Sequence, residues 1–219
     1  MPLIIPPAPP QSIDAMRTAV PALAHGSALM KVAPRLSAAL NSSSAAASLS
    51  PALSYKVYTL GLSDIASATG NSFGTPVLSV WRHTLTSENE VVTADVAVDK
   101  AGTNYQFAAI SSNPSAPGVQ NEIAALSKSP DLAGTSYEVS LLQIPALAVS
   151  ALWLHDPTRS AASAGATSSS GNASDILVPV APVRSELVAG RHYTISEFTD
   201  ALKAPAAKIL ANDDPLKGS

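Results

Sequence analysis

The sequence predicts an α+β fold with a largely antiparallel sheet of about six to seven strands, covered by two or three helices and preceded by an N-terminal helical, proline-rich extension. Two observations lead to this prediction. Three short apolar segments alternate with polar residues, and the turns between them are too short for a crossover connection. The longest apolar run, residues 137–156, is interrupted by Pro145 and divides into two more segments of strand length.

Three regions are expected along the chain. Residues 1–53 form a proline-rich arm, a helical extension and a Ser/Ala-rich linker, residues 54–211 form a single α+β domain, and residues 212–219 form a polar tail. The prolines of residues 1–10 favour an extended chain, which is either a solvated tail or an arm that lies on a neighbouring subunit. The acid-poor, Ser/Ala-rich composition of this region also leaves a targeting segment open.

Apolar residues at helical spacing predict two helices in the extension. Ser12 is expected to cap the first helix, which Pro21 interrupts. The second is expected over residues 27–40, with a kink at Pro34. Residues 41–50 are a low-complexity run of serine and alanine, which is typical of a linker.

The body of the chain is expected to begin with a strand near Tyr55. A short helix over residues 64–69 follows, which Ser63 caps and Gly70 ends. Next come a meander of three antiparallel strands and one helix. These four elements are expected at residues 77–85, 91–98, 105–110 and 119–128.

Within residues 137–156, Tyr137, Val139 and Leu141 alternate with polar residues, as in a half-buried strand. Pro145 lacks an N–H and should bend or end the ladder. The nearly continuous apolar run that follows favours a strand buried on both faces, although a buried helix shows the same pattern. A membrane span is not expected, because polar residues and Pro145 break the run.

Residues 157–174 hold too little apolar surface to order themselves, and we expect a mobile loop. A strand over residues 176–183 is expected at an edge of the sheet, because it contains Pro179 and Pro182. Ser196 is expected to cap the last helix. The side of this helix that faces the body is predicted to comprise Phe198, Leu202, Ile209 and Leu210.

Composition excludes several classes of function. Charged residues make up 13% of the chain and the net charge is −3, which argues against a nucleic-acid binder that works through a basic surface. The chain has no cysteine, so disulfides, thiolate nucleophiles and cysteine-based metal centres are excluded. Phosphate-binding glycine motifs and metal-type histidine spacings are absent from the sequence, so no cofactor or metal is expected. The N-terminus lacks the cationic segment of a secretory signal, which favours a cytoplasmic or assembly-associated location.

One motif match points to a hydrolase. Residues 70–74 fit the nucleophile-elbow pattern G-x-S-x-G around Ser72. That chemistry requires a strand before the serine and a helix after it, whereas here a predicted helix precedes and a predicted strand follows. We therefore interpret the segment as a turn and keep a hydrolase that uses Ser72 as an alternative.

Two other groups of residues are candidate sites. His155 and Asp156 end a predicted buried strand, where a His–Asp pair can transfer protons. Trp81, Arg82 and His83 lie on a predicted strand and can form a binding face with an aromatic anchor. The structural alternatives are a polar strand end for the first group and, for the second, a core tryptophan beside a solvent-exposed arginine.

The low charge, the small-residue surface and the proline-rich arm favour a non-enzymatic structural or interaction protein. Such a protein acts through self-assembly or as a subunit of a larger complex, so its expected partners are itself or other protein subunits. One alternative is a small-ligand-binding module, in which the sheet and the helix over residues 119–128 enclose a pocket. The other is a hydrolase-type enzyme that uses Ser72 or the pair His155 and Asp156.

Overall fold

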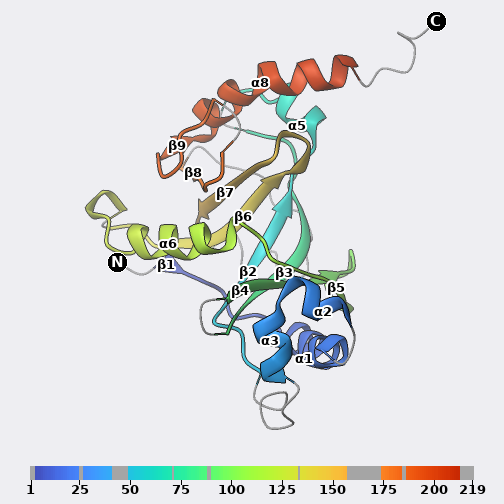
Figure 1. Ribbon diagram of the computed structural model, residues 1–219. Coiled ribbons are helices and arrows are strands. Elements are labelled where there is room, and N and C mark those ends of the chain that lie inside the picture. The colour runs from blue at the N-terminus through green and yellow to red at the C-terminus, as the bar shows by residue number, and fades with distance from the viewer. Residues whose placement is uncertain are drawn as a thin grey trace, which may run out of the picture.

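The computed structural model describes residues 3–24, 27–40, 49–70, 72–87, 90–132, 134–156, 174–183 and 186–212. These residues form an α+β fold with nine strands in one sheet and six α-helices, so the predicted fold class is confirmed (Figure 1). The strand count exceeds the prediction partly because β1 (Leu3–Ile4) and β9 (Tyr193–Thr194) have two residues each, too few to show an alternating pattern.

The strands lie in the order β5-β4-β3-β2-β6-β7-β8-β9, and β1 pairs with β6 beside this path. Antiparallel pairing of β3, β4 and β5 confirms the predicted meander. Antiparallel pairing of β6 with β7 confirms that the long apolar run supplies two strands. The bounds of the longer strands are β2 Leu53–Thr59, β3 Val77–Ser87, β4 Glu90–Val98, β5 Tyr105–Ser111, β6 Tyr137–Ile144, β7 Val149–His155 and β8 Ile176–Pro179.

A short parallel ladder joins two antiparallel halves of the sheet. Strands β2 and β6 pair only between Val57–Thr59 and Leu141–Gln143. Beyond this ladder, β1 pairs in parallel with Tyr137 and Glu138 of β6. Leu3 and Ile4 therefore lie on the chain's own sheet, and the expectations of a solvated tail or an arm on a neighbouring subunit are wrong for these two residues.

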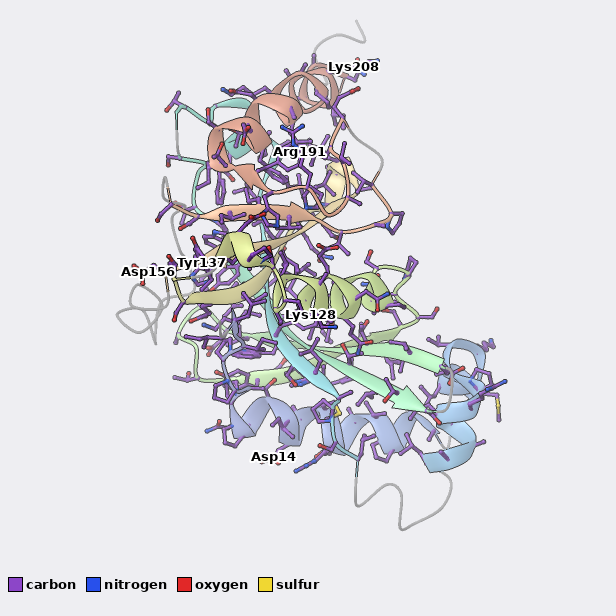
Figure 2. All side chains as sticks on the ribbon, turned by 90° about the vertical axis from the view of Figure 1, so that its left-hand side faces the viewer. Asp14, Lys128, Tyr137, Asp156, Arg191 and Lys208 are labelled. Carbon is purple, nitrogen blue, oxygen red and sulfur yellow. The ribbon has the colours of Figure 1, made fainter. Side chains whose placement is uncertain are left out.

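Helices cover both faces of the sheet. We call the side that carries Trp81, Val96 and Trp153 face A, and the opposite side face B. Face A carries α1, α2 and α3 over β3 to β5, and α5 and α8 over the other half, whereas α6 covers face B (Figures 1 and 2). Their bounds are α1 Pro10–Ala24, α2 Ser27–Val32, α3 Pro34–Leu40, α5 Leu62–Ala66, α6 Ala116–Leu126 and α8 Ile195–Asn212.

The N-terminal helices belong to the core of the molecule. Ser12, Met16, Val20 and Ala24 of α1 are buried at a spacing of four residues and form one stripe of the helix. The stripe packs on Leu85 and on the face A residues of β4. Ser12 was expected as the N-cap, but the helix begins earlier, at Pro10, because proline suits the first helical position. Pro21 lies inside α1. The second predicted helix is interrupted just before Pro34, which divides it into α2 and α3.

Two other helix starts differ from the predictions. Helix α5 begins at Leu62 rather than at residue 64, and the backbone N–H of Gly61 donates to the Asp64 carboxylate at 3.2 Å, so Ser63 is not the cap. Helix α8 begins at Ile195 with Thr194 and Glu197 forming a capping box, because each side chain accepts from the other residue's backbone N–H. Ser196 is therefore already helical.

The C-terminal part also corrects two expectations. Strand β8 was expected at an edge, but β9 pairs with its first two residues and forms the edge instead. Phe198 and Leu202 of α8 are buried as predicted, whereas Leu210 is 39% exposed because the end of α8 extends past the sheet (Figure 1). Residues 41–48 of the predicted linker at 41–50, residues 157–173 of the predicted loop at 157–174 and residues 213–219 of the predicted tail at 212–219 lie outside the described residues. Within the described part of the chain, no helix has the length and apolar character needed to cross a membrane.

The two methionines of the N-terminal helices test this packing. Met16 is fully buried under face A, whereas Met30 on α2 is 51% exposed. Met16→Ala is expected to lower the free energy of unfolding by about 2–5 kcal/mol, because it leaves a cavity between α1 and the sheet. Met30→Ala, the matched control, is expected to change it by less than about 0.5 kcal/mol. Urea unfolding measures both, and equal effects would contradict the placement of α1 in the core.

Candidate functional site

The candidate residues of β3 point to opposite faces of the sheet. Trp81 and His83 lie on face A, and Arg82 lies on face B, as expected for consecutive residues of a strand. Their exposed fractions are 4%, 0% and 7% for Trp81, His83 and Arg82. These side chains therefore present no exposed aromatic anchor, and each makes contacts inside the protein.

His83 connects the helical layer to the sheet. Its Nε2 lies 2.8 Å from the hydroxyl of Ser12 on α1, and its Nδ1 lies 2.9 Å from the hydroxyl of Ser54 on β2. Burial lowers the pKa of His83 to about 4, and the nearby carboxylate of Asp95 opposes this shift only in part. The imidazole is therefore neutral at pH 7, so one ring nitrogen donates to one serine and the other accepts from the second.

Arg82 forms a buried ion pair on face B. Its Nε and a terminal nitrogen donate to the two carboxylate oxygens of Asp95 on β4 at 2.7 and 2.8 Å, in a bidentate arrangement. The phenol of Tyr55 lies beside this pair, and burial raises its pKa while the positive charge of Arg82 partly opposes the shift. Arg82 is therefore not solvent-exposed, although the structural alternative predicted that it would be. It is buried, and its charge is balanced by a carboxylate on the neighbouring strand.

His155 belongs to a polar cluster on face A, between the two groups of helices. We call Lys56, Glu138, Ser140 and His155 the central polar cluster. The Lys56 ammonium donates to Glu138 at 2.8 Å, and the Nε2 of His155 lies 3.3 Å from the Ser140 hydroxyl and 3.9 Å from the Glu138 carboxylate. Asp156, the other member of the candidate pair, is exposed beyond the end of β7 (Figure 2).

The cluster lacks the geometry of a catalytic triad. In a triad the serine approaches one ring nitrogen and the carboxylate approaches the other. Here Ser140 and Glu138 both face Nε2 of His155, and all three side chains are buried. Burial, with a smaller contribution from the Glu138 charge, raises the pKa of Tyr58 to about 12, so the phenol beside the cluster stays protonated.

Trp153 anchors the core next to this cluster. Its ring centroid lies 5.4 Å from that of Tyr58, 5.7 Å from that of Phe73 and 4.7 Å from that of His155. Its indole N–H donates to the carboxylate of Asp175 at 2.9 Å, and both residues are buried. Asp175 was missed in the sequence, because nothing local marks a carboxylate that a tryptophan 22 residues away will bind.

Ser72 lies between a helix and a strand, the reverse of the order that a nucleophile elbow requires, as the sequence predicts. It is exposed, follows α5 and precedes β3, and it forms an isolated bridge with Thr69. The described residues provide no hydrogen-bond partner for its hydroxyl. The nucleophile-elbow geometry, in which a strand leads into the serine and a helix follows, is absent at this position.

Open hollows and ionisable clusters offer little to a ligand. Among the described residues, no group of three or more histidine, aspartate or glutamate side chains is placed to hold a metal ion. One hollow at the turn between β6 and β7, lined by Gln143, Ser150 and Pro182, has a volume of about 230 Å³, below the usual range for ligand pockets. A second of about 330 Å³ lies at the turn between β4 and β5, and its carboxylate, Asp99, already accepts hydrogen bonds from Thr103.

Comparison with known proteins adds no family. The chain matches no protein-family model, no curated protein and no solved structure.

The open edge of the sheet at β5 is the remaining candidate for an interaction site. Strand β5 ends the sheet and pairs only with β4. Among the described residues, its outward-facing backbone groups have no backbone partner. The edge is also uncharged, because no Asp, Glu, Lys or Arg occurs between Lys100 and Glu122. At the opposite edge, β9 has only two residues and therefore presents far fewer backbone groups for pairing.

The buried state of His83 predicts a pH dependence of stability. An unfolded chain binds a proton at this residue near pH 6.5, whereas the folded protein does so only near pH 4. Stability from this group is therefore fully present above about pH 6.5 and falls as the pH drops to 4, by about 3 kcal/mol.

His83→Gln is expected to remove this part of the acid sensitivity, as measured by urea unfolding between pH 7.5 and 4. His192→Gln is the matched control, because His192 lies in a loop and is only half-buried. Parallel losses of stability in the His83→Gln variant and the unmodified protein would contradict the assignment.

The ion pair between Arg82 and Asp95 can be tested with a double-mutant cycle. Arg82→Leu alone or Asp95→Leu alone is expected to cost about 3–5 kcal/mol, because each leaves a buried partner without its neighbour. The double variant Arg82→Leu/Asp95→Leu is expected to recover most of this loss, since no charge remains. Chemical unfolding measures the cycle, and additive losses would show that the two side chains act independently.

Proposed function

We propose that this chain is a non-enzymatic interaction protein that takes up a strand from a partner along the open edge of β5. One observation carries the proposal: β5 is a seven-residue edge strand without charge or proline, and its outward backbone groups lack backbone partners among the described residues. Such an edge is a template for strand addition, in which main-chain hydrogen bonds supply affinity and alternate side chains supply specificity.

Soluble proteins usually protect such edges with lysine, proline, short strands or bulges. Of these devices β5 has only a bulge, at Ala108, where the pairing with β4 shifts by one residue. The exposed side chains of Gln106, Ala108 and Ala109 are small or neutral and allow a second backbone to approach. The edge is therefore suited to a partner that is itself an uncharged strand.

The interior supports binding over catalysis. The ionisable candidates within the strands, Arg82 and His83 on β3 and His155 on β7, are buried, and each lies within hydrogen-bond distance of another side chain of the protein. Both described hollows are open, and neither exceeds about 330 Å³, the lower end of the usual range for ligand pockets. A small-ligand module and a hydrolase that uses Ser72 or His155 remain weaker alternatives, because neither has a site geometry to support it.

A peptide probe tests the proposal. The probe is a dye-labelled peptide with the sequence of residues 104–112, NYQFAAISS, and its matched control carries N-methyl groups at alternate residues, which removes outward N–H donors. The first peptide is expected to bind the full chain with a dissociation constant in roughly the micromolar range, and the control is expected to bind at least about tenfold more weakly.

Fluorescence anisotropy measures both affinities, and hydrogen exchange locates the bound peptide. Amides of β5 are expected to exchange more slowly with the peptide bound, while those of α8 stay unchanged. Equal binding of the two peptides, or protection away from β5, would contradict strand addition at this edge.

A further inference from the structure

The bulge in β5 shifts by one residue the alternation of its side chains between face A and face B. In the pairing with β4, Phe107 lies opposite Val96 and Ala109 lies opposite Asp95, so Ala108 has no partner on β4. Face A of β5 consists of Tyr105, Phe107 and Ile110, which pack against the buried residues of β4, and face B consists of Gln106, Ala109 and Ser111. The strand is therefore apolar on face A on both sides of the bulge.

This shifted alternation allows β5 to pair with a second copy of itself so that apolar side chains meet apolar side chains. Antiparallel pairing sets residues of the same face opposite one another. If a two-fold axis passes between Ala108 and Ala109, Phe107 lies opposite Ile110 of a second copy, and Gln106 lies opposite Ser111 of that copy. Face A then meets face A, face B meets face B, and the exposed Ala108 meets the exposed Ala109.

Neighbouring registers fail this test. An axis through Ala108 sets Phe107 opposite Ala109 of the second copy, and an axis through Ala109 sets it opposite Ser111. Both place an apolar residue of face A opposite a residue of face B. An axis between Phe107 and Ala108 sets these two opposite each other, one facing the core of face A and one exposed.

We infer that the partner strand is β5 of a second copy of this chain, antiparallel to the first about an axis perpendicular to the sheet between Ala108 and Ala109. The inference rests on the proposed function and names its partner. Such an axis keeps face A on the same side in both copies, so the two sheets become continuous. Because residues 101–121 carry no charge, the symmetric contact of identical strands brings no like charges together.

Paired charge variants test this arrangement. Light scattering and sedimentation of the full chain are expected to show a dimer that dissociates on dilution. Ala108→Lys/Ala109→Lys places four ammonium groups around the axis, and Ala108→Glu/Ala109→Glu places four carboxylates there. Each variant alone is expected to dimerise at least about tenfold more weakly, and an equimolar mixture of the two is expected to recover dimerisation as heterodimers.

The matched control is Ala108→Ser/Ala109→Ser, which changes the same exposed positions without charge and is expected to keep the affinity of the unmodified chain. Thermal unfolding checks that all variants fold, since exposed substitutions are expected to change stability by less than about 0.5 kcal/mol.

The outcomes separate this inference from the proposed function. A monomer up to about 1 mM that still binds the peptide at β5 would overturn the second copy as partner and leave strand addition standing. A dimer unaffected by the charge variants, in a chain that does not bind the peptide, would overturn both. Recovery of dimerisation in the mixed sample supports antiparallel pairing of β5 with β5 around Ala108 and Ala109, because only such a contact brings the opposite charges together.

Discussion

The parallel ladder between β2 and β6 is the constraint on which the rest of the structure depends. It spans only three residue pairs, and it is the sole link within the described sheet between two antiparallel halves. Each half has its own helices on face A, whereas the cluster under α6 on face B contains residues of both. Where the ladder ends, the ion pair between Lys56 and Glu138 and the pairing of β1 with β6 continue the contact. Packing on face B therefore compensates for a short ladder on the sheet itself.

Burial of polar groups determines what this fold can do. A charged or polar side chain that leaves water must find a partner, since an unpaired buried group costs more than the interaction gains. Arg82, His83 and His155 satisfy this requirement inside the protein, and the same contacts remove them from the surface. The unpaired backbone groups at an edge of the sheet are a surface feature that side-chain motifs do not reveal. The edge of β5 is the largest such feature among the described residues.

Much of the secondary structure could be predicted from local patterns. Alternation located β3, β4 and β5, and Pro145 divided β6 from β7, because strand periodicity and the missing N–H of proline act within a few residues. Element ends were less predictable. Ser12 and Ser196 both satisfied the rule for helix caps, yet each lies inside its helix. Another local signal sets the start instead: Pro10 at the first helical position of α1, and the capping box of Thr194 and Glu197 at α8. Two-residue strands such as β1 have no local signal at all.

The sequence by itself determined the fold class, the meander and the apolar core, because these follow from periodicity and composition. It also placed Trp81 and His83 on one side of a strand and Arg82 on the other. Only the tertiary structure decided which residues each of them meets. Ser12 lies 71 residues from His83, and Lys56 lies 82 residues from Glu138, so no spacing rule connects them. The open edge likewise depends on which strand is last in the sheet, and strand order is set by long-range pairing that local patterns do not encode.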